Sequence, residues 1–487
     1  MLQDALWSLP ALRRLEIEAE LQGLDLMQRA ARATAAWTRR HLPPGARILV
    51  AAGPGNNGGD ALYAALLLMQ EGYSLDILMP QMPASPQAQQ AYLALRSAGG
   101  IPLQQLAADA PAPALLIDGL FGIGLSRPLD TKWLALIHQL DQLDCQRLAL
   151  DCPSGLNAYT GQVQQACIHA THTLTFLCHK PGLFYSAGAD HAGQVELATL
   201  DCPPALQPAP EGYLNRQGAQ ALQRRRDSHK GSHGTVAIIG GSEGMLGAAL
   251  LAGRAALAGG AGKVHVLALD GRLAADTSCP ELMLHDARQP HSQPDCDVLA
   301  TGPGLGQSRQ ARQWLEHALA SPLPLVLDAD ALNMLASDAQ LQDLLAMREA
   351  DTILTPHPAE AARLLGNSTA TVQADRLAAV QQLVSRFDCL VILKGAGTLI
   401  AAAGQPYQLN TSGGPALAVA GQGDVLSGLI AALLAQGMPA MAACCLAVRV
   451  HGMAGDEYQQ ETGGPIGLTA TATAHRCSLI LNRLLNA

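Results

Sequence analysis

The stretch ARILVAAGPGNNGGD, residues 46–60, decides the fold of the first part of the chain. Its apolar half is typical of a strand buried on both faces, and its second half gathers four glycines and two asparagines. A hairpin turn at Asn57-Gly58 is the alternative, but the run that follows, ALYAALLLMQEG, has helical periodicity. The stretch therefore predicts a strand, a glycine-rich loop and a helix, with bare backbone N–H groups that can approach an anion.

The same alternation of strand and helix continues along the chain. Further strands are expected at 74–80, 114–124 and 147–156, with helices at 85–100 and 131–141 between them. Parallel strands joined by helices form a sheet that is covered on both faces. The fold class is therefore α/β, with a doubly wound first unit.

A second series of strands follows a break in the pattern. Proline and charged residues dominate residues 202–230, which is typical of a domain junction. GTVAIIGG, residues 234–241, and a long Ala/Leu/Gly helix then begin another α/β series. We predict two domains, 1–215 and 216–487.

Composition and charge narrow the function classes. The 487 residues are 49% hydrophobic and carry a net charge of −9, so a broad nucleic-acid or membrane surface is not expected. The first residues contain acids and lack the apolar core of a signal peptide, and no later run is long and apolar enough to span a membrane. The eleven cysteines include no CxxC pair, which is typical of reduced thiols. We expect a cytoplasmic protein.

Three loops of the first unit carry polar residues directly after predicted strands: GPGNNGGD, DGLFGIGLSRP and DCPSGL. Because the carboxyl ends of parallel strands meet at one edge, we expect these loops to form a ligand site there. Asn57, Asp118 and Ser154 could hold a hard cation through oxygen, and Asp151 could act as a general acid or base. The alternative is that the two aspartates only cap turns.

These residues resemble the NAD(P)H-hydrate epimerase family over roughly residues 1–210. The resemblance rests on NNGGD, on GIGLSRP at 122–128 and on LDCPSGL. It implies a Rossmann-like fold, a potassium site at Asn57, Asp118 and Ser154, and Asp151 as the acid or base that contacts the substrate. It also implies a set of residues that bind the hydrated nicotinamide dinucleotide: Asn56, Asn57, Gly58, Gly59, Asp60, Gly122, Ile123, Gly124, Leu125, Ser126, Arg127, Pro128 and Asp151. Ala61 stands where the family usually has glycine, and alanine suits the start of a helix.

In the second unit, AGQGDVLSG at 420–428 opens an apolar helix. Gly421 and Gly423 can direct N–H groups toward a phosphoryl group, with Asp424 beside them as a base, although a simple capped helix start has the same pattern. Lys394 follows a predicted strand and could reach a nucleotide phosphate or lie in solvent. His357, between two prolines, could contact a ligand ring or be structural.

KGSHG, GPGLG, DADALN, TPHPAE, LKGAGT and GQGDVLSG, in this order, resemble the ADP/ATP-dependent NAD(P)H-hydrate dehydratases from about residue 225 to the end. The resemblance implies a ribokinase-like fold, Mg²⁺, and ADP as co-substrate. It places Gly304, His357 and Asp424 against the hydrated dinucleotide. It implies nucleotide contacts from Lys394, Gly395, Ala396, Gly397, Thr398, Gly421, Gln422 and Gly423. Gln422 replaces a small or apolar residue of the family, which leaves nucleotide preference and rate open.

Both halves then point to one damaged metabolite, NADH or NADPH with a hydrated nicotinamide ring. The first half would interconvert the R and S epimers, and the second would dehydrate the S form while ADP becomes AMP and phosphate. There are two alternatives. The chain could be a vitamin-type kinase with an accessory first half, or its first half could bind the dinucleotide without catalysis. The sequence does not determine whether NADH or NADPH is the preferred substrate, or whether ADP or ATP is used. The Ala-rich helices suggest a homo-oligomer.

Overall fold

The computed structural model describes residues 4–107, 111–124, 128–272, 274–288 and 294–485. Leu125, Ser126 and Arg127 of the predicted substrate loop lie outside these residues. The chain divides into two compact units, Met1–Tyr213 and Leu214–Ala487. Each unit is described by itself.

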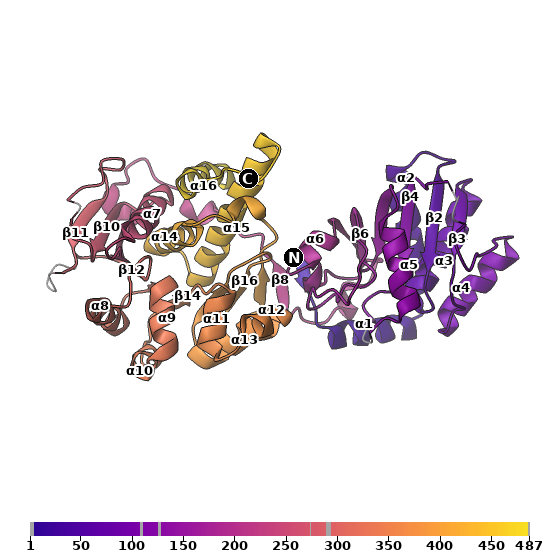
Figure 1. Ribbon diagram of the computed structural model, residues 1–487, viewed down its shortest axis with the longest axis horizontal. Helices are drawn as coiled ribbons and strands as arrows, with labels where there is room; N and C mark the ends of the chain where they lie inside the picture. The colour runs from indigo at the N-terminus through magenta and orange to yellow at the C-terminus, as the bar shows by residue number, and fades with distance from the viewer. Residues whose placement is uncertain (1–3, 108–110, 125–127, 273, 289–293, 486–487) are drawn as a thin grey trace. The chain divides into compact units, whose positions relative to one another are not determined.

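A parallel sheet with strand order β3-β2-β4-β5-β6-β7 forms the centre of the first unit (Figure 1). Its strands are β2 (Arg47–Ala52), β3 (Ser74–Leu78), β4 (Leu115–Gly119), β5 (Gln146–Leu150), β6 (His172–Phe176) and β7 (Gln194–Ala198). The strand order turns back at β2, because β3 lies on one side of it and β4 on the other. In such sheets ligands bind at this reversal, outside the carboxyl ends of the strands.

Helices cover both faces of this sheet, as predicted. Val50 and Ile117 belong to a core shared with α2 (Leu26–His41), α3 (Asn56–Gln70) and α4 (Pro86–Ser97). Leu49 and Leu116 point the other way and pack with α5 (Thr131–Asp141). The remaining elements are α1 (Leu9–Leu21), α6 (Gly188–His191) and a short antiparallel pair, β1 (Ala5–Leu6) and β8 (Gly212–Leu214).

Helix α3 begins earlier than the sequence predicted, because the NNGGD segment forms its first turns rather than a loop. A Cβ atom on Gly58 would lie 1.9 Å from the backbone oxygen of Gly53. A Cβ atom on Gly59 would lie 2.5 Å from the side chain of Met27 on α2. Gly58 is therefore required by close backbone packing of α3, whereas a side chain at position 59 would first displace the end of Met27.

The second unit is a larger α/β sheet with order β17-β16-β15-β14-β13-β12-β9-β10-β11. Its neighbours run parallel from β11 to β15, and β16 and β17 pair antiparallel at the edge. The strands are β9 (Thr235–Gly240), β10 (Lys263–Ala268), β11 (Met283–Asp286), β12 (Val298–Thr301), β13 (Leu325–Leu327), β14 (Thr352–Leu354), β15 (Leu390–Leu393), β16 (Leu399–Ala401) and β17 (Tyr407–Leu409).

Ten helices of this unit surround the sheet, among the residues that the structure describes: α7 (Leu246–Ala258), α8 (Arg309–Ala320), α9 (Ala329–Ser337), α10 (Ala339–Ala346), α11 (Pro358–Leu365), α12 (Thr369–Ala374), α13 (Arg376–Phe387), α14 (Gln422–Ala435), α15 (Ala440–Thr462) and α16 (Ala470–Leu484). Helices α7, α14, α15 and α16 share one apolar core with the sheet. The predicted α/β fold class, with a doubly wound first unit followed by a second α/β unit, is confirmed.

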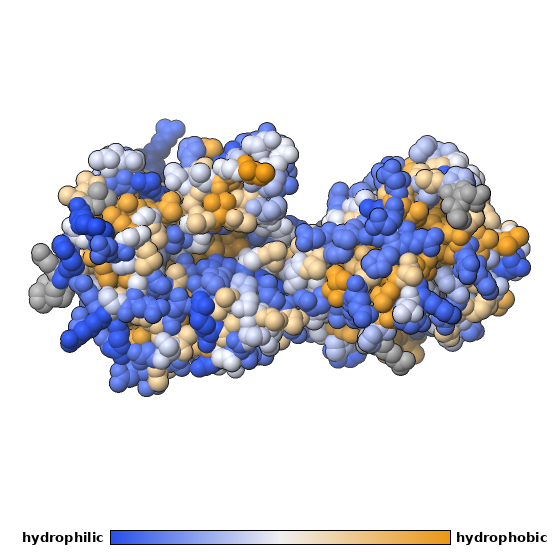
Figure 2. Space-filling model, viewed as in Figure 1, coloured by the Kyte–Doolittle hydropathy of each residue, from blue (hydrophilic) through white to orange (hydrophobic). Residues whose placement is uncertain are grey.

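Polar side chains are spread over the visible face of both units, and apolar residues form separate patches (Figure 2). Within the described ranges, no helix is long and apolar enough to cross a membrane. Eight of the cysteines are buried thiols.

Candidate active sites

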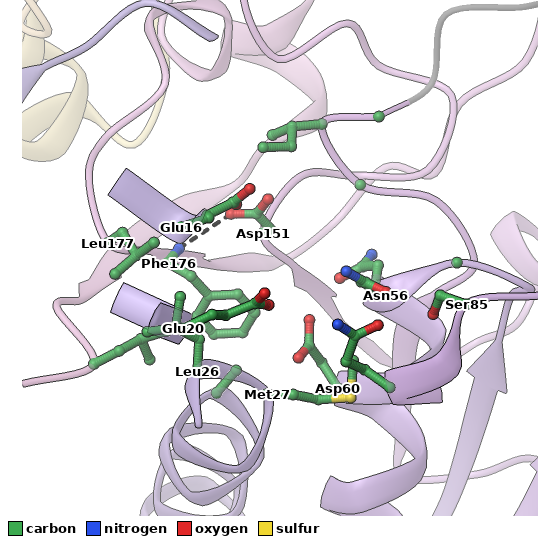
Figure 3. A pocket seen from close by; sticks show the side chains of 18 of the residues that line it. Glu16, Glu20, Leu26, Met27, Asn56, Asp60, Ser85, Asp151, Phe176 and Leu177 are labelled. Atoms are coloured by element: carbon green, nitrogen blue, oxygen red, sulfur yellow. Dashed lines mark hydrogen bonds between the residues drawn. The ribbon is translucent and has the colours of Figure 1, made fainter. Parts of the chain in front are cut away.

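A cavity of about 1060 Å³ lies at the carboxyl ends of β2, β4, β5 and β6 in the first unit (Figure 3). The loops that follow these strands contribute Asn56, Phe121, Asp151 and Leu177 to its lining. Helix α1 and the start of α2 close another side. The three loops predicted to share one edge of the sheet therefore do so.

Seven of the predicted substrate residues line this cavity: Asn56, Asn57, Asp60, Gly122, Ile123, Gly124 and Asp151. Gly58 and Gly59 are buried behind the lining, and Pro128 is exposed outside it. Their predicted contact with substrate would therefore require a change of structure.

The four glycines of residues 53–60 serve different purposes. A Cβ atom on Gly53 would lie 1.8 Å from the backbone oxygen of Leu120, so this glycine lets two loops cross closely. Gly55 has no atom within 4 Å of such a Cβ position, and it lines the cavity. Only this glycine presents bare backbone to a ligand, together with the N-terminal end of α3.

Asp118 and Ser154 form a buried pair beneath the cavity. Asp118 accepts hydrogen bonds from the Ser154 hydroxyl at 2.6 Å and from the Ser154 N–H at 2.8 Å. Burial raises the pKa of Asp118 to about 6, although these hydrogen bonds oppose the shift. The amide of Asn57 is buried nearby, packed against Gly122, and neither of its polar atoms has a partner among the described residues. A buried amide without a partner fits a missing ligand.

Asp151 is paired with a buried lysine that the sequence analysis did not single out. Lys180 is 1% exposed and donates a short hydrogen bond to Oδ1 of Asp151. It also donates to the Phe176 carbonyl at 2.6 Å and to the Thr175 hydroxyl at 3.0 Å. Burial opposes the charge of Lys180, but the carboxylate of Asp151 outweighs it, and the pKa of Lys180 is raised. A lysine directly after a buried strand, in LTFLCHKP, was the available signal.

Further acids line the same cavity from α1 and α3. Glu16 and Glu20 project from α1, and Asp60 from α3 (Figure 3). Burial is the largest cause that raises the pKa of Asp60 well above its usual value, and the charges of Asp151 and Glu16 add to it. The α1 residues were not predicted, because nothing in a surface-type helix pattern shows that it covers a pocket.

A second buried carboxylate–lysine pair lies at the strand ends of the C-terminal unit. Asp328 follows β13, and Lys394 follows β15. The Lys394 ammonium lies 2.7 Å from one oxygen of Asp328, and Ser427 donates to the other oxygen at 2.8 Å. Burial favours the neutral acid, but Lys394 outweighs it and holds the pKa of Asp328 below its usual value. Neither Asp328 nor Ser427 was predicted as a site residue.

His357 caps helix α11. Its Nδ1 accepts a hydrogen bond from the N–H of Ala359 at 3.1 Å, and Glu360 accepts one from the N–H of His357 at 2.8 Å. Because Nδ1 accepts, the proton lies on Nε2, which is 3.2 Å from the Glu360 carboxylate. Glu360 also lies 3.9 Å from Lys394. His357 thus has a structural role beside the lysine.

Asp424 lies in the first turn of α14. Burial raises its pKa to about 7, and the charge of Asp328 adds to the shift while Lys394 opposes it. A Cβ atom on Gly423 would lie 3.4 Å from the Lys394 ammonium, so the start of α14 meets the lysine directly. An acid that titrates near neutral pH at a helix start is suited to general base catalysis.

Gln422 is turned away from the predicted nucleotide loop. It is 6% exposed, donates to the Thr473 hydroxyl at 3.0 Å and lies 3.2 Å from Nε2 of His451. The side chain therefore joins the start of α14 to α15 and α16, and only its backbone faces the loop side.

The remaining predicted residues lie in loops at the same strand ends. Residues 394–398 follow β15, and Arg376, which is 1% exposed, donates to the carbonyls of Leu393, Lys394 and Gly397. Gly395 has a φ of 132°, which favours glycine. Gly304 follows β12 with a φ of 59°, and its carbonyl accepts from the N–H of Ser242 at 2.7 Å. A separate cavity of about 600 Å³ near Pro322 and Met347 contains none of these residues.

The fold and these sites define a chain with two independent α/β ligand centres, each with an aspartate–lysine pair at its strand ends. Residues 236–477 match the family model described as NAD(P)H-hydrate dehydratase, and residues 23–182 match the YjeF-related protein N-terminus. A bifunctional NAD(P)H-hydrate repair enzyme of Coxiella burnetii is 35% identical over 97% of each chain. The chain belongs to the family of bifunctional NAD(P)H-hydrate repair enzymes, which confirms the resemblance seen in the motifs.

Two further relatives match the second unit. An ADP-dependent (S)-NAD(P)H-hydrate dehydratase of Neisseria meningitidis is 44% identical over 54% of this chain and 89% of its own. The crystal structure of an ADP/ATP-dependent NAD(P)H-hydrate dehydratase from Bacillus subtilis, obtained with ATP and Mg²⁺, is 30% identical with a TM-score of 0.48, and it covers 54% of this chain and 94% of its own. The relatives from Coxiella burnetii and Neisseria meningitidis favour the repair family over the vitamin-type kinase.

Removal of the lysine of the first site should cost more stability than removal of the whole pair. Lys180→Met leaves the Asp151 carboxylate buried without its cation, and loss of one partner of a buried pair costs about 3–5 kcal/mol. The double variant Asp151→Asn/Lys180→Met should recover most of this loss. Calorimetry of the full chain measures it, and equal melting temperatures for the single and double variants would contradict the expectation.

Proposed function

We propose that the first unit epimerises hydrated NADH and NADPH, and that the second unit dehydrates the S epimer with conversion of ADP to AMP and phosphate. The observation that carries this proposal is the presence, in one chain of the repair family, of two separate strand-end sites that each contain an aspartate in contact with the ammonium of a lysine. A kinase with an accessory first half would not require the pair at Asp151.

In the first unit, Asp151 contacts the hydrated ring as an acid or base, and the end of α3 receives the pyrophosphate. Asn57, Asp118 and Ser154 would hold K⁺, since the unpartnered amide of Asn57 lies beside the buried oxygens of the other two. Bound there, K⁺ would supply positive charge under the loop that carries Phe121. The remaining predicted residues, Asn56, Asp60, Gly122, Ile123 and Gly124, would contact the dinucleotide.

In the second unit, Asp424 takes the proton of the ring hydroxyl as the hydroxyl oxygen attacks the terminal phosphoryl group of ADP. AMP leaves, and the ring then loses phosphate, with a proton from the adjacent carbon, to restore NAD(P)H. Phosphate is a better leaving group than hydroxide, which is why a dehydratase uses a kinase-like site. Lys394 and the N–H groups at the start of α14 would face the transferred group.

Nucleotide and metal would be bound by the loops around this helix. The nucleotide contacts would come from residues 394–398 and from Gly421, Gln422 through its backbone, and Gly423. Mg²⁺ would neutralise phosphate charge when bound, and it commonly needs only one or two carboxylates besides phosphate oxygens. The Asp330 carboxylate, whose charge contributes to the raised pKa of Asp424, fits that need and leaves Asp424 free to act as the base.

The boundaries of the two functional domains, 1–215 and 216–487, are part of the proposal, as are a cytoplasmic location and a homo-oligomer. Light scattering of the purified chain tests the last of these, and a monomeric mass would contradict it.

Mixed epimers of hydrated NADH, supplied with ADP and Mg²⁺, should be converted completely to NADH by the intact chain. With the Asp151→Asn variant, conversion to NADH should stop when the S epimer is used up, because only the epimerase is impaired. Asp424→Asn should lower dehydration by about 10²–10⁴-fold, the usual contribution of a general base. Absorbance of NADH follows the reaction. Complete recovery with Asp151→Asn would contradict the epimerase assignment.

Dehydration should depend on pH through Asp424. The base must be ionised, and its pKa is about 7, so kcat/KM should rise with pH below 7 and level off above it. Asp330→Asn removes one of the negative charges that raise this pKa, and the inflection should therefore move to lower pH. Rates with the pure S epimer measure both profiles, and an unmoved inflection in the variant would contradict the assignment.

Epimerisation should require K⁺. Replacing K⁺ by choline should lower the rate, and Asn57→Asp should weaken the preference for K⁺ over smaller cations, because it adds charge to the site. Initial inversion rates across a K⁺ titration measure this. An inversion rate independent of K⁺ would contradict the potassium site and would mean that Asn57, Asp118 and Ser154 have only a structural role.

A further inference from the structure

The carboxyl of Asp60 faces the cavity of the first site without a polar partner among the described residues. It projects from α3 into the cavity, and no described residue makes a hydrogen bond or an ion pair with it (Figure 3). Asp151 reaches the same cavity from the loop after β5, and its Oδ1 is held by Lys180 and by the N–H of Phe176. Two carboxyls from different elements thus face one cavity, one with a cation and one without.

The two carboxyls have different electrostatic surroundings. Asp151 is in direct contact with the ammonium of Lys180, and loss of either partner would leave the other charge buried. Asp60 has no cation in contact, and burial together with the charges of Asp151 and Glu16 favours its neutral acid form. Two carboxyls in such different environments are a common arrangement for an acid and a base.

The proposed substrate limits how inversion can occur. Hydration of the enamine of a reduced nicotinamide puts the hydroxyl on the carbon bonded to the ring nitrogen. Inversion at that carbon must break either its bond to oxygen or its bond to nitrogen. Loss of the hydroxyl as water leaves a positive charge shared with nitrogen, which nearby carboxylates stabilise.

We propose that Asp60 is the general acid and Asp151 the general base of epimerisation, which proceeds by loss and re-addition of water at the ring carbon. Asp60 gives its proton to the hydroxyl, the C–O bond breaks with its electron pair on oxygen, and water leaves a carbon–nitrogen cation. A water molecule then adds to the opposite face and gives a proton to Asp151. Asp151 then returns this proton to solvent water and Asp60 takes one up, which restores the starting state. In the reverse reaction Asp151 is the acid and Asp60 the base. This inference rests on the proposed epimerase function.

The charge of the cavity supports this route. Its lining carries five acids, Glu16, Glu20, Asp25, Asp60 and Asp151, against two cations, Arg13 and Lys180. Carboxylates near the reacting carbon favour a cationic ring, which forms only during the reaction.

Inversion of the pure R epimer in ¹⁸O-labelled water tests the route with the intact chain. Mass spectrometry of the earliest S product should show one ¹⁸O atom for each inversion, after subtraction of an enzyme-free sample. Retention of the original oxygen in the inverted product would mean that the bond to nitrogen opens, and would overturn the proposal. Absence of any inversion would instead contradict the epimerase function.

Variants at position 60 test whether Asp60 is the general acid. Asp60→Asn should lower the inversion rate by about 10²-fold or more, and Asp60→Glu should recover part of it, because the acid is restored. Glu20→Gln, which removes another acid from the exposed rim of the same cavity, should change the rate less than Asp60→Asn does. Melting temperatures show that each variant is folded. A folded Asp60→Asn chain with the parent rate would overturn the assignment.

Discussion

A buried lysine that must stay beside an aspartate constrains both sites. Lys180 follows β6, and its ammonium contacts Asp151 at the end of the neighbouring strand β5. Lys394 follows β15, and its ammonium contacts Asp328, which follows β13 on the far side of β14. A charge largely removed from water is tolerated only when it is paired and hydrogen-bonded, so each pair fixes the relative position of two strand ends. The loops that carry the substrate-facing groups are attached to these ends. Such pairs add little net stability over apolar residues, and their value lies in placing charge where the ligand binds.

Close backbone packing is the second constraint, and it explains why the glycine-rich segment has so little side chain. Gly53 and Gly58 leave no room for a Cβ atom, which allows β2, the loop after β4 and the first turn of α3 to meet. The same tight crossing leaves Gly55 and the two asparagines that follow it at the cavity wall. Glycine thus acts mainly through the protein's own packing, and it exposes backbone to a ligand at one position of the four.

The sequence predicted what depends on local pattern. The strands, the doubly wound class and the convergence of loops at one edge followed from periodicity, because parallel strands bring their carboxyl ends together wherever they fold. Lys180, Asp328 and the α1 acids were not predicted, because their importance depends on which strands become neighbours and on which helix covers the pocket. Gln422 shows the same limit: its substitution in a glycine loop suggested a changed ligand contact, whereas the side chain packs against α15 and α16.

The two sites use one electrostatic arrangement for different chemistry. In each unit the lysine neutralises one aspartate and leaves a second aspartate, Asp60 or Asp424, buried near that negative charge without a cation in close contact. Burial and the neighbouring carboxylate raise the pKa of the second aspartate in both units, and Lys394 partly offsets the shift of Asp424. In the proposed mechanism the acid of the first unit donates a proton. The acid of the second unit titrates near pH 7 and can accept a proton from a hydroxyl. A lysine–carboxylate pair with a second acid beside it can thus be used for proton donation or for proton acceptance.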